Sequence, residues 1–315
     1  MRGTVIAAFV AGIVILAGLA GAWPSRALAY EEISVADGGT LTGTVKLTGD
    51  VPHPKGYNLT TLPDQIYCGR ISDGRGWRLF QPFDVGEGGA FRQVVVYIES
   101  ISRGRSFAEA APPRIEAKDC RFLPMVNLVR DDRDITVVNM DPAMHDIQAY
   151  ETSHLGPRVL FNVPLPISQR YPHEAGLSAH FSKHYEGQPV SQRVHMTKGR
   201  RVFVMQCGFH AYMESWALVK DHPYYAVTDD QGRFSLTDVP PGTYRVIVWH
   251  PYMREAAAKD VTIKSKETVS LDVTIEAPTG RLYANQMVEN PYVRYTITED
   301  VQSAIVPTLE KQVYR

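Results

Sequence analysis

The 315-residue sequence lacks a strong excess of either charge, since 33 basic and 34 acidic residues leave a net charge of −1. It therefore predicts neither nucleic-acid binding nor attraction to an anionic membrane surface. Low-complexity runs and long internal repeats are absent. The C-x-x-C-H haem-attachment motif and the H-E-x-x-H, G-x-S-x-G and P-loop patterns are also missing, so the sequence shows no sign of these haem or enzyme classes.

Amphipathic helices of three or more turns are missing too, whereas short β-type runs are frequent. These runs are rich in β-branched residues, and Gly, Pro, Asn and Asp punctuate the gaps between them. The segments expected to be strands are 41–47, 92–101, 122–129, 134–140, 159–165, 200–207 and 215–221. Many short strands without intervening helices predict an all-β protein built from β-sandwiches.

The amino terminus has the pattern of an export signal. Residues 4–23 form an uncharged, mostly apolar run, and Ala27-Leu28-Ala29 fits a small-x-small cleavage site. The sequence thus predicts a signal peptide over 1–29, a mature chain that begins at Tyr30, and a periplasmic or extracellular location. An uncleaved membrane anchor is the alternative, because the run is long enough to span a bilayer.

Cysteine is scarce, with Cys68, Cys120 and Cys207 as the three positions. An odd count in an exported chain leaves one thiol over. Cys68 and Cys120 lie in polar, turn-like contexts, whereas Cys207 ends a β-type run. The economical assignment is a Cys68–Cys120 disulfide, with Cys207 free to act as a metal ligand. A buried, inert thiol is the alternative for Cys207.

The segment QCGFHAYM supplies three soft or borderline ligands, Cys207, His210 and Met213, and His145 follows the expected strand 134–140. A trigonal set of two His and one Cys with a weak axial Met suits both Cu(I) and Cu(II). Two strand ends that meet at one pole of a sandwich can converge on one ion. The sequence therefore predicts a copper site, while zinc is less favoured because Met is a poor zinc ligand.

Further residues are candidates for the surroundings of this site. Phe203, Phe209, Tyr212 and Trp216 could exclude solvent from it. Asp146 directly follows His145, and His222 is close in sequence to the Cys207 loop. The stretch 150–199 is less regular, and its histidines are expected to be solvated loop residues: His154, His173, His180, His184 and His195.

A second unit begins near Asp221. Residues 222–253 have the pattern of three strands joined by Asp-Gln-Gly and Pro-Pro-Gly turns, and 259–277 adds two more strands. Five strands over about 55 residues predict a small β-sandwich at 221–276. Residues 277–315 are polar and show no core pattern, so we expect an extended tail.

The region 134–213 resembles the cupredoxin (plastocyanin-like, blue-copper) family, in which a His-Asn/Asp step follows a strand and a Cys-His-Met cluster closes the site. The resemblance implies a Greek-key sandwich over 30–220 with His145, Cys207, His210 and Met213 as copper ligands. The wider chain is similar to exported bacterial proteins that join such a domain to a carboxypeptidase-regulatory-like, transthyretin-like sandwich. That likeness rests on GTVKLTGDVP, VVVYIESI, the segment from Asp221 and the cysteines at 68 and 120.

Together these features predict an exported copper protein that carries single electrons. Its expected partner is a redox protein such as a c-type cytochrome, and the C-terminal tail would hold it in an assembly. A scaffold protein of a redox assembly, in which copper is structural or absent, is the first alternative. A copper-dependent oxidoreductase ranks below both, because a saturated four-ligand site leaves no open position for substrate.

Overall fold

The computed structural model describes residues 30–107, 112–152, 157–170, 184–197, 201–253, 256–279, 283–289 and 303–309. The expected signal peptide at 1–29 and His154, His173 and His180 lie outside these residues. Strands dominate, which confirms the all-β prediction, and the helices are single turns: η1 (Leu59–Thr61), α1 (Gln65–Cys68), η2 (Gly69–Ile71) and η3 (Glu87–Gly89). Within the described part of the chain, none of the helices has the length and apolar character needed to cross a bilayer.

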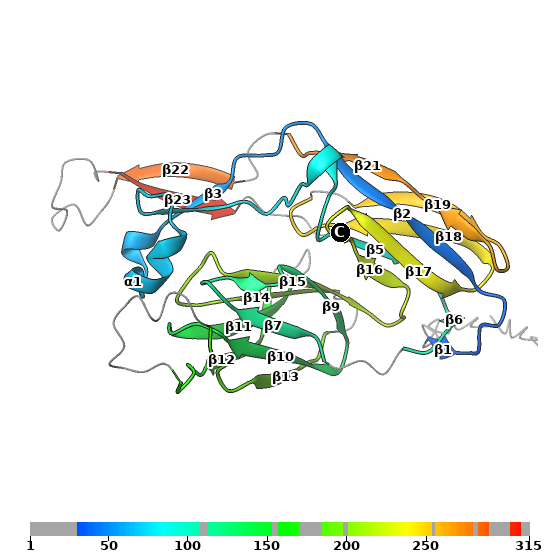
Figure 1. The fold of residues 1–315 in the computed structure, drawn as a ribbon, viewed down its shortest axis with the longest axis horizontal. Helices are drawn as coiled ribbons and strands as arrows, with labels where there is room; N and C mark the ends of the chain where they lie inside the picture. The colour runs from blue at the N-terminus through cyan, green and yellow to red at the C-terminus, as the bar shows by residue number, and fades with distance from the viewer. Residues whose placement is uncertain are drawn as a thin grey trace, which may run out of the picture.

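The first sandwich is built from two sheets (Figure 1). One contains, in spatial order, β13 (Val190–Val194), β10 (Arg133–Asn139), β7 (Arg114–Ala117) and β8 (Phe122–Leu123). The other contains β12 (Arg158–Leu165), β11 (His145–Thr152), β14 (Val202–Gln206), β15 (Glu214–Lys220) and β9 (Val126–Arg130). Alternate residues of β10 and β11 are fully buried, as Ile135, Val137, Ile147 and Ala149 show. This period of two is what a sheet with one face on a core requires.

The second sandwich combines strands from both ends of the chain. One sheet runs β16 (Tyr225–Val227), β5 (Val95–Ile98), β18 (Gly242–Trp249) and β19 (Ala257–Ile263). The other runs β17 (Arg233–Val239), β2 (Gly39–Thr48) and β20 (Thr268–Ser270), and β21 (Val273–Glu276) also pairs with β2. β2 and β5 lie within the first unit expected over 30–220, yet they belong to the second sandwich, so the sheets do not follow that division. A local apolar pattern specifies that a strand forms but not which strand it pairs with.

Three two-stranded ribbons complete the described structure. They are β1 (Glu31–Glu32) with β6 (Arg103–Gly104), β3 (Lys55–Asn58) with β4 (Trp77–Phe80), and β22 (Tyr283–Glu289) with β23 (Ser303–Leu309). The last ribbon lies in the segment expected to be an extended tail, and β23 runs beside β3 (Figure 1).

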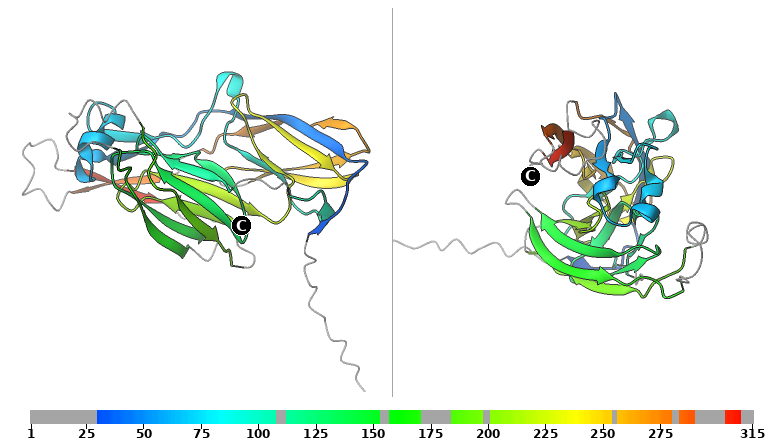
Figure 2. Two further views of the ribbon diagram at one scale, coloured as in Figure 1. Left: turned by 60° about the horizontal axis from the view of Figure 1, so that its bottom comes forward. Right: turned by 90° about the vertical axis from the view of Figure 1, so that its left-hand side faces the viewer.

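Residues 59–71, in the connection from β3 to β4, form a cap over one end of the first sandwich. It contains α1, which Figures 1 and 2 both show beside that end. The predicted disulfide is confirmed: Cys68 at the end of α1 is bonded to Cys120 in the turn between β7 and β8, with a Cα–Cα distance of 5.6 Å. The cap is thus covalently attached to the sandwich that it covers.

Candidate metal centre

Two neighbouring strands bring His145 and Cys207 together. β11 begins at His145, and β14 ends one residue before Cys207. The register pairs Ala149 with Met205, so residues 145, 147 and 149 share a face of the sheet with residues 205 and 207. The turn before β11 is held by Asn139, whose side chain donates to the Ala143 carbonyl and accepts from the Asp141 N–H, each at 2.9 Å.

The loop between β14 and β15 folds His210 back onto Cys207. The Cys207 N–H donates to the Met213 carbonyl at 3.1 Å, and the Met213 N–H donates to the His210 carbonyl at 2.8 Å. These two bonds close a tight turn, in which the Nδ1 atom of His210 lies 3.7 Å from the Cys207 sulfur. The C-x-x-H spacing therefore places both side chains at one point.

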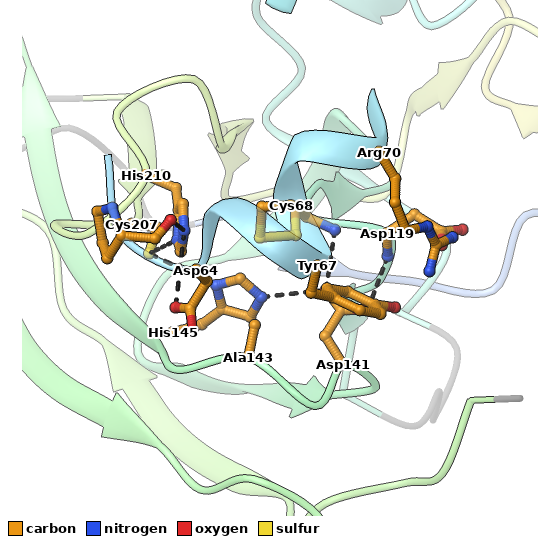
Figure 3. The surroundings of a disulfide bond; sticks show 12 residues. Asp64, Tyr67, Cys68, Arg70, Asp119, Asp141, Ala143, His145, Cys207 and His210 are labelled. Carbon is orange, nitrogen blue, oxygen red and sulfur yellow. Dashed lines mark hydrogen bonds and ion pairs between the residues drawn. A yellow bond between two sulfur atoms is a disulfide. The ribbon is translucent and has the colours of Figure 1, made fainter. Parts of the chain in front are cut away.

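The three side chains form one buried cluster (Figure 3). The Cys207 Sγ lies 3.8 Å from the His145 Nδ1 and 3.7 Å from the His210 Nδ1. The two rings meet edge to face, with centroids 5.0 Å apart and an interplanar angle of 67°. His145 and His210 are 0% exposed and Cys207 is 2% exposed. The structure thus unites the three predicted residues in a space from which solvent is excluded.

The outer nitrogen of each imidazole fixes which nitrogen faces the sulfur. The His210 Nε2 lies 3.2 Å from the Pro63 carbonyl oxygen, which can only accept a hydrogen bond, so this nitrogen carries the proton. The His145 Nε2 lies 3.0 Å from a carboxylate oxygen of Asp141 and donates to it in the same way. Both Nδ1 atoms therefore present lone pairs towards Cys207, which is a ready donor set for a metal ion.

Protonation in the cluster is governed by its burial. Burial raises the pKa of the Cys207 thiol to about 12, and burial lowers the pKa of His210, with the neighbouring His145 adding to that effect. Without a bound cation the cluster therefore holds a neutral thiol and a neutral His210 at pH 7. Such a thiol is a poor nucleophile, whereas a metal ion would displace its proton and gain a thiolate ligand.

Met213 lies at the other end of the same loop. Continuing the β14–β15 register, which pairs Gln206 with Glu214, sets Met213 opposite Cys207. Residues opposite each other in an antiparallel pair project from the same face of the sheet. Met213 is 0% exposed, so it contributes to the buried side of the sheet on which Cys207 lies. Its role as an axial ligand stays a prediction.

Among the residues expected around the site, Asp146 and Tyr212 support the cluster and Phe209 does not. The Asp146 carboxylate accepts from the Gly208 N–H and, at 3.3 Å, from the Gln148 amide, so it fastens the Cys207 loop to β11. The Tyr212 ring lies 5.7 Å from the His210 ring and is buried. Phe209, in contrast, is 39% exposed, so its assignment to a dry shell is wrong.

Trp216 also lies away from the site. It pairs with Val204, which is three residues before Cys207. Because successive side chains point to opposite faces, Val204 and Trp216 project from the face opposite Cys207. Its indole N–H donates to Glu214 at 2.6 Å, and its ring packs 6.0 Å from that of Tyr252 in the second sandwich. Trp216 thus belongs to the contact between the two sandwiches.

His222 is remote from the cluster because β15 separates the two. This strand runs over Glu214–Lys220 and advances by about 3.3 Å per residue. The His222 ring lies beside Tyr30 and Tyr224 and accepts from the Tyr224 N–H at 3.2 Å. Nearness in sequence to the Cys207 loop was therefore misleading for this residue.

Asp141 and Pro63 are the partners of the imidazoles that sequence reasoning missed. Asp141 is fully buried and precedes His145 by four residues, in an Asn-x-Asp-x-x-x-His segment that offered a local signal. Pro63 lies 147 residues before His210, and no local pattern connects them. His184 lies 3.5 Å from Asp119 and 3.8 Å from Asp141, outside the cluster, and the His195 side chain is 76% exposed.

Comparison with known proteins supports the second module. Residues 217–276 match the family model of the carboxypeptidase regulatory-like domain, which confirms the expected module and covers the last part of β15 and the strands from β16 to β21. No curated protein matches the chain.

Several solved structures align with part of the chain. A purple cupredoxin from Nitrosopumilus maritimus is 18% identical over 34% of this chain and 99% of its own, with a TM-score of 0.23. Amicyanin from Paracoccus versutus is 10% identical over 40% of this chain and 97% of its own, with a TM-score of 0.22. A copper-containing nitrite reductase from Thermus scotoductus is 16% identical over 40% of this chain and 25% of its own, with a TM-score of 0.24. At these TM-scores the likenesses carry no inference about metal or activity.

Proposed function

We propose that this chain is an exported copper protein that carries single electrons, with His145, Cys207, His210 and Met213 as ligands. The observation that supports this most is the convergence of two imidazole Nδ1 atoms on one buried cysteine sulfur, at 3.8 and 3.7 Å. Thiolate and imidazole are ligands that both oxidation states of copper accept, and bound copper would supply a one-electron couple between Cu(I) and Cu(II).

The metal-free chain already holds the proposed ligands in place. The Pro63 carbonyl and the Asp141 carboxylate hold the two rings with their Nδ1 atoms towards Cys207. Cys207 gives up its proton on binding and provides the one negative charge of the ligand set. Because these side chains are buried and anchored, little rearrangement is needed when the charge of the site changes.

Burial of the site favours electron transfer over substrate conversion. Both imidazoles are 0% exposed, and the cap supplies the carbonyl that contacts His210. A substrate would have to displace this cap, whereas an electron can cross the short hydrogen-bonded path from His210 to Pro63. The partner that we propose is a redox protein such as a c-type cytochrome, met in the periplasm or outside the cell.

A structural metal in a scaffold protein is the second candidate. It is favoured by the same complete cover of both imidazoles, together with the carboxypeptidase regulatory-like module at 217–276. The two candidates differ in one measurable property: a carrier must be reduced and reoxidised reversibly, and a structural site need not be.

The test is to load the purified chain with copper and to record its stoichiometry and visible absorption. We expect one copper per chain and an intense thiolate-to-copper band that bleaches with a mild reductant and returns on reoxidation. Cys207→Ser should remove the band, and Met205→Leu, at another fully buried position, should keep it. Copper binding without such a band would contradict the carrier, and irreversible bleaching would favour the structural role.

A further inference from the structure

Asp141 is a buried acidic group that the ligand set does not include. Its carboxylate lies in the turn between β10 and β11 and is 0% exposed. Oδ1 accepts from the Tyr67 hydroxyl at 2.9 Å and the Asp119 N–H at 2.8 Å. Oδ2 accepts from the Cys120 N–H at 2.8 Å and the His145 Nε2 at 3.0 Å. All four contacts are donors, so the group is a carboxylate that accepts through both oxygens.

The backbone beside this carboxylate is shaped to receive it. Asp119 and Cys120 are consecutive residues with φ of +50°, a left-handed conformation that side chains other than Gly rarely adopt. Two successive N–H groups in such a segment point to one side and form an anion-binding concavity. Both N–H groups here donate to Asp141, so we infer that the strained conformation of Asp119 and Cys120 is kept because it binds this carboxylate.

The disulfide connects this arrangement to the cap. Cys68 and Cys120 are bonded, and a ring nitrogen of His145 lies within 4.8 Å of both sulfur atoms. Tyr67, the residue before Cys68, supplies the hydroxyl donor (Figure 3). Three separate segments, the cap, the β7–β8 turn and the start of β11, thus meet at one carboxylate. The Nδ1 atom of His184 lies 3.8 Å from the Asp141 carboxylate and 3.2 Å from the Met140 carbonyl oxygen. His184 does not replace His145 as a partner of Asp141.

We propose that Asp141 is the positioning residue of His145. It holds the ring with Nε2–H towards the carboxylate and the Nδ1 lone pair towards Cys207. As a buried anion one imidazole away from the donor set, it also favours the more highly charged Cu(II) over Cu(I). The preference for Cu(II) over Cu(I) rests on the proposed function, whereas the orientation of the His145 ring concerns the metal-free chain alone.

The first test uses Asp141→Asn in the copper-loaded chain. The amide keeps the shape of the side chain but loses the charge and one acceptor oxygen. We expect the Cu(II) affinity to fall about 10- to 100-fold. The Cu(I) affinity should fall less, so the reduction potential should rise. The rise is about 59 mV for each factor of ten by which the loss of Cu(II) affinity exceeds the loss of Cu(I) affinity.

A second variant predicts a shift of the opposite sign. Tyr67→Phe removes one donor from Oδ1, which leaves more negative charge on the carboxylate and strengthens its hold on His145. The potential should therefore fall relative to the wild type. A merely structural role for Asp141 would move both variants in the same direction. Should Asp141→Asn fail to fold, Tyr67→Phe carries the test, and an unchanged or raised potential there would overturn the proposal.

Glu151→Gln is the matched control. Glu151 is also 0% exposed and accepts from Arg158 and from the Thr197 N–H, but it lies six residues along β11 from His145. Its replacement should lower the stability of the fold and leave the potential unchanged. An equal rise in potential in Glu151→Gln and Asp141→Asn would show that general destabilisation, and not positioning, is responsible.

The tautomer of His145 in the metal-free chain separates this proposal from the proposed function. Nitrogen NMR of the imidazole should show the proton on Nε2 in the wild type and in Glu151→Gln, and a mixture of tautomers in Asp141→Asn. A proton on Nδ1 in the wild type would overturn the positioning role. If the chain binds no copper and yet shows the Nε2–H form only while Asp141 is present, the electron-carrier proposal fails and the positioning role stands.

Discussion

The Nε2 atom of His210 lies 3.2 Å from the carbonyl oxygen of Pro63, although 147 residues separate the two. Pro63 belongs to the cap, which the Cys68–Cys120 disulfide attaches to the β7–β8 turn. The Cys120 N–H in that turn donates to Asp141, the partner of the other imidazole. One covalent bond thus supports the outer contacts of both rings.

Replacing both bridging cysteines should therefore weaken the fold and the site together. In the double variant Cys68→Ser/Cys120→Ser, the loss of a cross-link between residues 52 positions apart should lower the free energy of unfolding by about 4 kcal/mol in the chain-entropy model. Copper affinity should fall as well, because Pro63 and Asp141 would be held less firmly. Urea unfolding and competitive copper titration measure the two effects, and a loss of stability with unchanged affinity would show that the cap does not organise the site.

Met213 can be tested against a neighbour of the same burial. Met213 and Met205 are both 0% exposed, and both lie on the face of the sheet that holds Cys207. Leucine has nearly the same volume, so each Met→Leu change should cost less than about 1.5 kcal/mol of stability. If Met213 is the axial ligand, Met213→Leu should raise the reduction potential, because Cu(II) loses a donor, and Met205→Leu should not. Equal potentials in both variants would remove Met213 from the ligand set.

The opposite face of the same sheet provides a separate prediction. Trp216 donates its indole N–H to the buried carboxyl group of Glu214 at 2.6 Å, and burial raises the pKa of that group. Trp216→Phe removes the donor and should lower the free energy of unfolding by roughly 1–3 kcal/mol. The visible spectrum should not change. A smaller cost of Trp216→Phe in a Glu214→Leu background, which has no acceptor, would assign the loss to this hydrogen bond, and additive costs would not.

The residues of the cluster that could be predicted are those with a local signature. Cys207 and His210 share one turn, and His145 comes five residues after the apolar run 134–140, so spacing along the chain is sufficient to identify them. Spacing along the chain does not determine the face on which Trp216 lies, and its pairing with Val204 sets it on the face opposite Cys207. Phe209 is aromatic and yet 39% exposed, because composition does not determine whether a loop side chain points inward.

What could not be predicted depends on contacts between distant segments. The pairing of β2 with β17, β20 and β21 joins residues that lie near opposite ends of the chain, and an alternating pattern does not specify a partner. The contact between Pro63 and His210 is of the same kind. Asp141 is intermediate, since its spacing to His145 is local but its other three donors come from the cap and the β7–β8 turn.

Two buried histidines outside the cluster should make stability depend on pH. Burial lowers the pKa of His222 to about 4 and that of His250 to about 3, against about 6.5 in the unfolded chain. Both rings therefore stay neutral in the folded protein while the unfolded chain takes up protons below pH 6.5. Stability should fall as the pH decreases from 6.5 and go on falling towards these lower pKa values. The slope should be about 1.4 kcal/mol per pH unit for each histidine.

The interval between pH 6 and 5 tests this effect in the metal-free protein, and a His250 variant separates His250 from His210 and Glu214, whose pKa values burial also shifts. Glu151, whose pKa is lowered to about 2, contributes a similar loss only once the pH is near or below the unfolded value of about 4.5. His250 packs against Phe83 and Phe91, with ring centroids 5.4 and 5.0 Å away, so His250→Phe replaces it with a ring of similar shape. Whatever its stability at pH 7, the variant should lose less stability on acidification than the wild type. Urea titrations at successive pH values should show that its unfolding takes up about one proton fewer. Parallel pH profiles for wild type and variant would show that His250 is protonated equally in the folded and unfolded chains, which its complete burial between two phenyl rings argues against.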